Sequence, residues 1–227
     1  MQEFISFSSI IVVAVFCIII HEVAHGYVAL LNGDNTALVN GRLTLNPVKH
    51  FDLIGFLMMV FCRIGYAKPV PINPYYFKNR RLGMVTVSIA GISINLLTAF
   101  VAYPLYLLVI KYGGALFSLG VWGEIFYYLL YFLTSYLTIF SLNLALFNLL
   151  PFQPLDGYNF LENVFGVDNK VIRFLRDVGR YILIGLVLVS FIASTFRLPN
   201  ELNPLYWYIG TVRDWIIKLF DLIWWFI

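Results

Sequence analysis

The stretch FISFSSIIVVAVFCIIIHEVAHGYVALL, residues 4–31, decides the fold class of this chain. No acidic or basic residue interrupts it before His21, Glu22 and His25, and about 20 consecutive apolar residues suffice to cross a bilayer as a helix. A secretory signal peptide would carry positive charge ahead of a shorter apolar region, whereas only Glu3 precedes this one. We therefore expect a permanent transmembrane helix.

The composition of the whole chain is that of an integral membrane protein. Of its 227 residues, 61% are hydrophobic and only 12% are charged, about half the charged fraction of a soluble domain. The net charge is +3, and no Lys/Arg tract lies apart from the membrane flanks, so nucleic acid is not an expected partner. Cys17 and Cys62 lie far apart inside apolar segments, so they predict neither a disulfide framework nor a thiolate zinc site.

Three further apolar segments are long enough to span a membrane: residues 83–111, 121–150 and 179–196. Residues 53–62 form a shorter run, which favours a re-entrant or interfacial element. Residues 205–227 combine tryptophans with a polar stripe, which slightly favours an interfacial helix over a last span. We expect an all-α polytopic membrane protein with about four to six transmembrane helices.

No internal repeat or soluble domain is evident, so residues 1–227 are expected to form one membrane-embedded domain. Its catalytic core would occupy about residues 4–160, and its C-terminal helices residues 179–227. Basic residues gather in two loops, at 63–81 and 170–180, while the connection near 111–121 carries only Lys111. Under the positive-inside rule both basic loops are cytoplasmic, so the first helix also ends on that side and residues 53–62 do not cross.

Two shorter stretches lie between the first two long apolar segments. Residues 36–45, TALVNGRLTL, contain two β-prone runs around Asn40-Gly41, the strongest two-residue hairpin signal. Residues 67–74, AKPVPINP, contain three prolines, which exclude a helix and favour extended backbone. We therefore expect a small β-hairpin and a re-entrant element after the first helix.

The sequence His21-Glu22-Val23-Ala24-His25 points to a metal site. Residues i and i+4 lie on one helical face about 6 Å apart, so both imidazoles can reach one ion. Glu22 is displaced by about 100° around the helix and can approach a water in the open coordination position without being a ligand. Each ionisable group in hydrocarbon costs at least a few kcal/mol, which disfavours a chance match. The expected chemistry is hydrolysis by a zinc-activated water, with Glu22 accepting its proton.

A catalytic zinc with two histidines needs a third protein ligand. For His50, beside a turn at the membrane surface, a hydrogen-bonding role is favoured over ligation. The segment NLLPFQPLDG, residues 148–157, has two prolines that end the third long helix, and Asp156 is expected in a non-helical stretch after it. Spacing alone leaves Asp156 open between a ligand and an ordinary Asp-Gly turn. The expected depth of Asp156 in the membrane favours the ligand role. The first and third long helices end on the same side, and His21 lies roughly 15 Å from that end, so Asp156 could fold back to meet it.

These motifs resemble those of the site-2 protease family of intramembrane zinc metalloproteases, over about residues 8–160. The matching features are HEVAH in a membrane helix, followed by NLLPFQPLDG. GRLTLNPVKH and GYAKPVPINP are similar to the compact bacterial and archaeal branch, which has neither a PDZ nor a nucleotide-binding domain. HExxH alone is moderately specific, whereas the two motifs in this order on membrane helices are highly specific.

The resemblance implies one Zn²⁺ per chain, with ligands His21, His25 and Asp156 and with Glu22 activating water. The implied activity is cleavage of peptide bonds within or near transmembrane segments of membrane-protein substrates.

Two asparagines carry over from the family as substrate-binding or site-organising positions, Asn148 and Asn95. A helix-end cap is the alternative role for Asn148. Ile92 stands where many relatives have proline, which leaves the role of Asn95 open, and Gly91 could equally form a helix-packing surface.

The resemblance also implies partners and location. The expected substrate is a transmembrane protein, with membrane lipids around the site and a regulatory membrane protein as a further candidate partner. The expected location is a bacterial or archaeal cell membrane, with the active site toward the cytoplasmic side. Because hydrolysis needs an extended peptide, we hypothesise that the hairpin at 36–45 binds unwound substrate as an added strand. A hairpin that only shapes the membrane boundary is the alternative.

Two other functions would use the same buried cluster. A cation or proton transporter would need a continuous polar path, but residues 7–20 offer only Ser8, Ser9 and Cys17. A catalytically inactive scaffold would have no need of the four side chains of His21, Glu22, His25 and Asp156. The zinc endopeptidase is therefore the leading interpretation.

Overall fold

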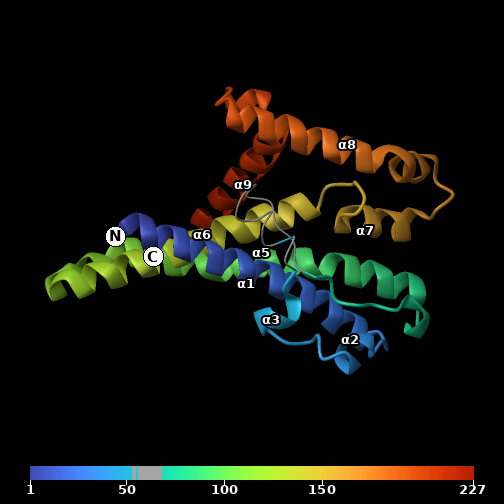
Figure 1. The fold of residues 1–227 in the computed structure, drawn as a ribbon, viewed down its shortest axis with the longest axis horizontal. Coiled ribbons are helices and arrows are strands. Elements are labelled where there is room, and N and C mark those ends of the chain that lie inside the picture. The colour runs from blue at the N-terminus through green and yellow to red at the C-terminus, as the bar shows by residue number, and fades with distance from the viewer. Residues whose placement is uncertain (53–54, 56–67) are drawn as a thin grey trace.

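The computed structural model describes residues 1–52, 55 and 68–227 (Figure 1). Across these residues the regular structure is helical and contains no strand. The expected all-α architecture is therefore confirmed for the described part of the chain. The re-entrant element expected over 53–62 falls almost entirely outside it.

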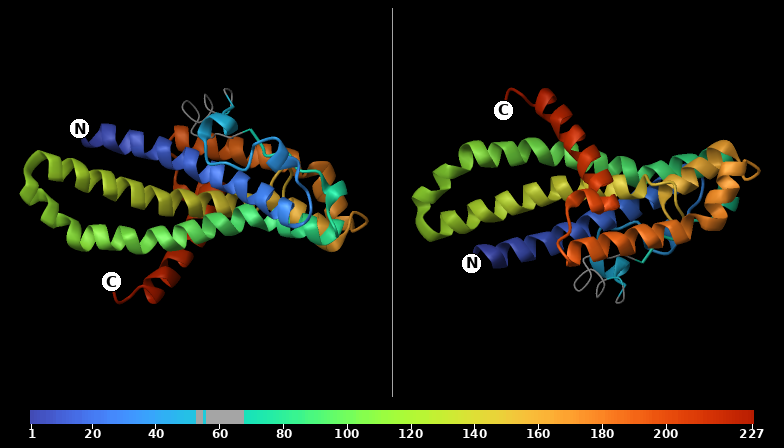
Figure 2. Two further views of the ribbon diagram at one scale, coloured as in Figure 1. Left: turned by 90° about the horizontal axis from the view of Figure 1, so that it is seen from below. Right: turned by 90° about the horizontal axis from the view of Figure 1, so that it is seen from above.

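Three long helices form the bundle at the centre of the molecule: α1 (Gln2–Leu31), α5 (Arg80–Tyr112) and α6 (Gly120–Asn148). A 3-10 segment, η2 (Gly113–Leu119), joins α5 to α6. α1 and α6 run in one direction and α5 in the other (Figure 2). Small side chains let helices approach closely in a membrane, and the buried residues of this bundle include Ala14, Cys17, Ala99, Ala102, Ser141 and Ala145.

Three helical stretches of the described residues are long and apolar enough to cross a membrane: Gln2–Leu31, Arg80–Asn148 and Lys170–Thr195. The second of these comprises α5, η2 and α6. The four spans expected from the sequence all fall on these stretches. Many large apolar side chains on their outer faces are exposed, as expected for surfaces that contact lipid. The chain is a membrane protein, and the number of its crossings stays a prediction.

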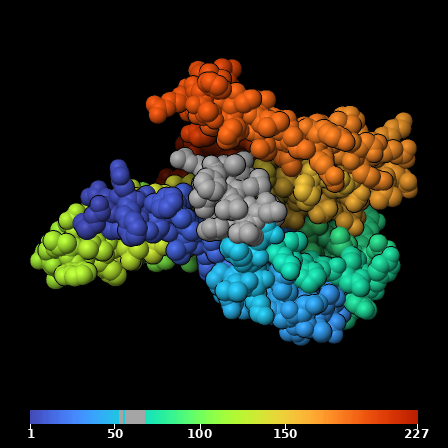
Figure 3. Space-filling view, viewed as in Figure 1, coloured from blue at the N-terminus to red at the C-terminus, as the bar shows by residue number. Residues whose placement is uncertain are grey.

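The C-terminal part folds back over the bundle. It contains α7 (Asp156–Phe165), α8 (Lys170–Thr195), η3 (Asn200–Leu202) and α9 (Pro204–Ile223). Figure 3 shows α8 at one edge of the molecule, opposite the connection that follows α1.

α9, the helix within residues 205–227, crosses the bundle at a steep angle (Figure 2). Phe220 packs against Tyr103 of α5 and Leu142 of α6 in one buried cluster, and the Tyr103 hydroxyl donates a hydrogen bond to Asp221. The segment is therefore a helix packed on the bundle, and whether it lies at the interface or spans the membrane stays a prediction.

The β-hairpin expected over residues 36–45 is wrong. Residues Thr36–Val39 form a short helix, α2, and Asp34 accepts hydrogen bonds from the Thr36 backbone and hydroxyl at its start. Gly41 has φ +61°, and the following amide, that of Arg42, donates to the carbonyl of Ala37 at 2.9 Å. This is the bonding of a helix C-terminus closed by a left-handed glycine. Asn-Gly supplies a positive φ, which a hairpin turn and a helix cap both need, so the dipeptide alone does not distinguish them.

The rest of the connection is irregular. A second short helix, α3 (Pro47–His50), precedes the undescribed residues, and η1 (Pro74–Tyr76) precedes α5. Between the undescribed residues and η1, residues 68–73 contain no helix, as the prolines predict.

Asp34 ties this connection to the end of α1. It is fully buried, and its second carboxylate oxygen accepts a 2.6 Å hydrogen bond from the Asn73 amide. Burial raises the pKa of Asp34, but the hydrogen bonds from Thr36 and Asn73 outweigh it and lower the pKa below its ordinary value. The carboxylate is therefore ionised at neutral pH and fixes two chain segments that are 39 residues apart.

We expect Asp34→Ala to lower the thermal midpoint of the detergent-solubilised protein by about 4–8 °C, because it leaves two partly buried backbone amides, those of Thr36 and Asn73, without their partner. Asp168→Ala removes an exposed carboxylate and is the matched control. Thermal unfolding followed by tryptophan fluorescence measures both. Equal midpoints for the two variants would contradict the anchoring role.

Candidate metal centre

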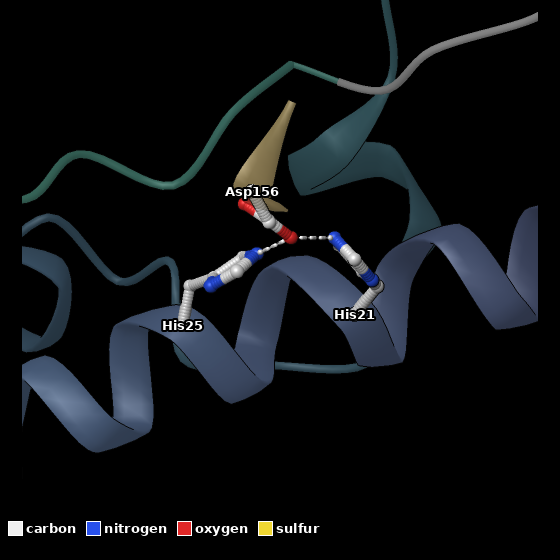
Figure 4. Close-up of side chains that lie close together, drawn as sticks. All are labelled: His21, His25 and Asp156. Atoms are coloured by element: carbon white, nitrogen blue, oxygen red, sulfur yellow. Dashed lines mark ion pairs between the residues drawn. The ribbon is translucent and has the colours of Figure 1, made fainter. Parts of the chain in front are cut away.

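Three potential metal ligands meet where α1 passes the start of α7 (Figure 4). Asp156 Oδ2 lies 3.1 Å from His21 Nε2 and 3.2 Å from His25 Nε2. A tetrahedral zinc with bonds of about 2.0–2.1 Å separates its ligand atoms by about 3.3–3.4 Å. These two distances are close to that separation, and all three ligand atoms lie within 4.8 Å of one another, so the three residues could hold one ion. Within the described ranges, no other group of His, Cys, Asp or Glu has this arrangement.

Backbone geometry brings the two imidazoles together. One helical turn separates His21 from His25, and their ring centroids lie 4.7 Å apart. The Nδ1 of His25 contacts the carbonyl oxygen of Val87 on α5 at 2.8 Å. Because a carbonyl only accepts, Nδ1 carries the proton, and Nε2 is the ring nitrogen that can bind a metal ion.

Asn95 orients the other imidazole. Its side chain is fully buried, and its amide lies 3.1 Å from His21 Nδ1. A His21 that binds metal through Nε2 has its proton on Nδ1 and needs an acceptor there. The buried Oδ1 of Asn95 has no other partner, and a half-turn of the amide presents it to Nδ1. Asn95 therefore contacts a candidate metal ligand. It is not among the residues that line the cavity of the site.

Asp156 is placed by a tight return of the chain after α6. It is the first residue of α7, so the expectation of a non-helical position is wrong, although the preceding residues 149–155 are irregular as the prolines predict. Gly157 is buried against this return, and a Cβ there would lie 2.6 Å from the Leu150 carbonyl oxygen. The glycine is thus needed for close backbone approach, not for an unusual φ.

The electrostatics of the site favour an ionised carboxylate. Burial raises the pKa of Asp156, but hydrogen bonds and positive charge from His21 and His25 outweigh it and lower the pKa to about 2. A carboxylate must be ionised to bind a metal ion. Asp156 is therefore in its ligand form at neutral pH.

Glu22 lies beside the three ligands without joining them. It lines a cavity of about 350 Å³ together with His21, His25 and Asp156. Its Oε2 accepts a 2.9 Å hydrogen bond from the amide of Val70. This is the placement expected of a group that takes a proton from a metal-bound water.

The remaining candidates are not part of the ligand group. Asn148 lines the cavity wall, and its side chain donates to the Leu144 carbonyl one turn earlier at 3.0 Å. His50 is buried, and its Nε2 lies 2.8 Å from the Thr44 carbonyl oxygen, which confirms the expected hydrogen-bonding role.

Comparison with known proteins finds relatives that are named as zinc metalloproteases. Bacillus subtilis YwhC, which is named as a proposed zinc metalloprotease, is 37% identical to this chain over 211 residues, covering 89% of this chain and 86% of YwhC. The chain belongs to the site-2 protease family. Rip2 of Mycobacterium tuberculosis, named in the same way, is 28% identical over 88% of this chain and 69% of its own length. No family model and no solved structure matches the chain.

Gly91 of this site-2 protease family member lies against a candidate metal ligand, a position that the sequence did not indicate. Gly91 on α5 lies directly against the His21 ring, and a Cβ there would be 2.6 Å from both ring nitrogens. The helix-packing surface that we expected as an alternative role for Gly91 is present, because α5 approaches α1 closely here. The sequence did not indicate that the side chain packed against this glycine is a candidate metal ligand.

We expect Gly91→Ala to weaken zinc binding about 10- to 100-fold, because the methyl group must displace the His21 ring. Gly185→Ala is the control, since a Cβ at that helical glycine meets nothing within 4 Å. Zinc retained against a graded series of chelator concentrations gives the two affinities. If both variants held zinc equally, the contact with His21 would have no bearing on the ligand.

Proposed function

We propose that this protein is an intramembrane zinc endopeptidase that hydrolyses peptide bonds within or near transmembrane segments of membrane-protein substrates. One observation carries the proposal: the potential ligand atoms of His21, His25 and Asp156 lie within 4.8 Å of one another, with Glu22 on the same cavity. Family membership and the names of the relatives support it.

The residues present fit a catalytic zinc, which would supply a Lewis acid and lower the pKa of a bound water toward 7. Val87 and Asn95 hold the two imidazoles in the orientation that directs Nε2 inward. Glu22 takes the proton of the attacking water at a carboxylate oxygen and later gives it to the leaving amine nitrogen. The half-enclosed cavity limits the water that surrounds the reacting carbonyl.

The proposal includes the location of the site. His21 lies ten residues before the end of α1 at Leu31, so the site is inside the membrane near one surface. The connection that follows that end carries Lys68 and Lys78, and the first turn of α5 carries Arg80 and Arg81. We infer that this is the cytoplasmic side of a bacterial or archaeal membrane, and that substrates approach from the surrounding lipid.

We expect Glu22→Gln to retain one zinc per chain and to lose cleavage by at least about 100-fold, because the amide cannot accept the proton. Glu124→Gln is the control and should cleave normally, because it changes a carboxylate near the start of α6, whereas the site lies beyond the end of that helix. The assay reconstitutes the zinc-loaded protein with a tagged single-span membrane protein and measures the released fragment. A Glu22→Gln variant as active as the control would refute the mechanism, and metal-dependent ion flux without a fragment would favour a transporter.

We expect Asp156→Ala to weaken zinc binding at least about 100-fold, since it removes one of three protein ligands. Asp168→Ala, at an exposed position twelve residues later, is the matched control. Metal analysis after dialysis measures both. Zinc affinity equal to that of the control would exclude Asp156 from the metal site.

A further inference from the structure

The segment formed by residues 68–73 passes the site and directs one backbone amide at Glu22. Proline has no N–H, and prolines occupy positions 69 and 71. Val70 stands between them, and its amide donates to Glu22 Oε2 at 2.9 Å. The proline on each side limits this stretch to extended backbone and so limits where the amide can point.

Both ends of the segment are fixed to buried groups that are independent of Glu22. At Lys68, the carbonyl accepts from Arg42 Nη2 at 2.7 Å and the amide donates to the His50 carbonyl at 2.9 Å. At Asn73, the amide donates to the buried carboxylate of Asp34 at 2.6 Å. The position of the Val70 amide is therefore determined by the connection between α1 and α5, and Glu22 is the partner that adjusts.

The side chain of Val70 rests on α1 itself. It is 6% exposed and packs against Gly26, where a Cβ would lie 2.7 Å from Val70 Cγ1 and equally close to Leu43 Cδ2. Gly26 follows Glu22 by four residues, so the two share one face of the helix. Val70 thus contacts that face twice, with its amide at Glu22 and with its side chain at Gly26.

We propose that Val70 is a positioning residue for the reaction: its amide holds one oxygen of Glu22 so that the other faces the water that the metal would bind. Gly26, which has no side chain, lets Val70 approach α1 closely enough for this. The inference rests on the proposed endopeptidase function. A glutamate side chain samples several rotamers, and a hydrogen bond that selects one before substrate binds removes an ordering cost from the proton transfer.

A purely structural role for the same bond leads to different measurements. If the bond only attached the segment to α1, its loss would lower the thermal midpoint, or change zinc content or KM, and leave kcat per zinc-loaded molecule unchanged. A positioning role reduces kcat while zinc content and KM stay the same.

The experiment compares two substitutions at one position in the zinc-loaded full-length protein. Val70→Pro removes the N–H and suits the extended backbone between two prolines. Val70→Ala also loses the valine side chain but keeps the N–H. We expect kcat for a tagged single-span membrane protein to be about 10- to 100-fold lower for Val70→Pro than for Val70→Ala, the range for losing a hydrogen bond to a charged group.

A second variant tests the same idea without changing the segment. Gly26→Ala should force Val70 away from α1 and lower kcat with zinc content retained, whereas Gly185→Ala, at an open glycine, should not. Equal kcat for Val70→Pro and Val70→Ala, with an active wild type, would overturn this inference alone. A zinc-loaded wild type that releases no fragment would overturn the proposed function and this inference with it.

Discussion

The close contact between α1 and α5 is the constraint on which the site depends. Two imidazoles inside an apolar bundle are costly to bury unless each has a partner. α5 supplies partners for both imidazoles, through the Val87 carbonyl and the Asn95 amide. It can do so only because Gly91 leaves room for the His21 ring. Helix packing and orientation of the imidazoles are therefore the same requirement in this protein.

The parts of this arrangement that could be predicted from sequence are those set by local rules. A long apolar run predicts a spanning helix, and helical periodicity places His21, Glu22 and His25 correctly relative to one another. Two prolines ending α6 made Asp156 a candidate for the third ligand. Its convergence with the histidines needed the fold, because residues at positions 25 and 156 meet only through the packing of α1, the end of α6 and α7.

The errors and omissions arise where one local signal serves two structures. Asn40-Gly41 caps a short helix although it is also a strong hairpin signal, since both structures place the glycine at a positive φ. Val70 gave no signal at all, because its contribution is a backbone amide that every residue except proline possesses. Its flanking prolines predicted extended backbone, but not that the one amide between them would reach Glu22.

The chain return that carries Asp156 packs on elements other than the helix that carries the histidines. Leu150 and Leu155 on that return pack with Leu183 of α8, and α7 packs on α5, whereas His21 and His25 lie on α1. An ion shared by the three ligands would thus act as a cross-link between the first helix and the return that follows α6. The free energy of metal binding would then contribute to the cohesion of the whole molecule as well as to its chemistry.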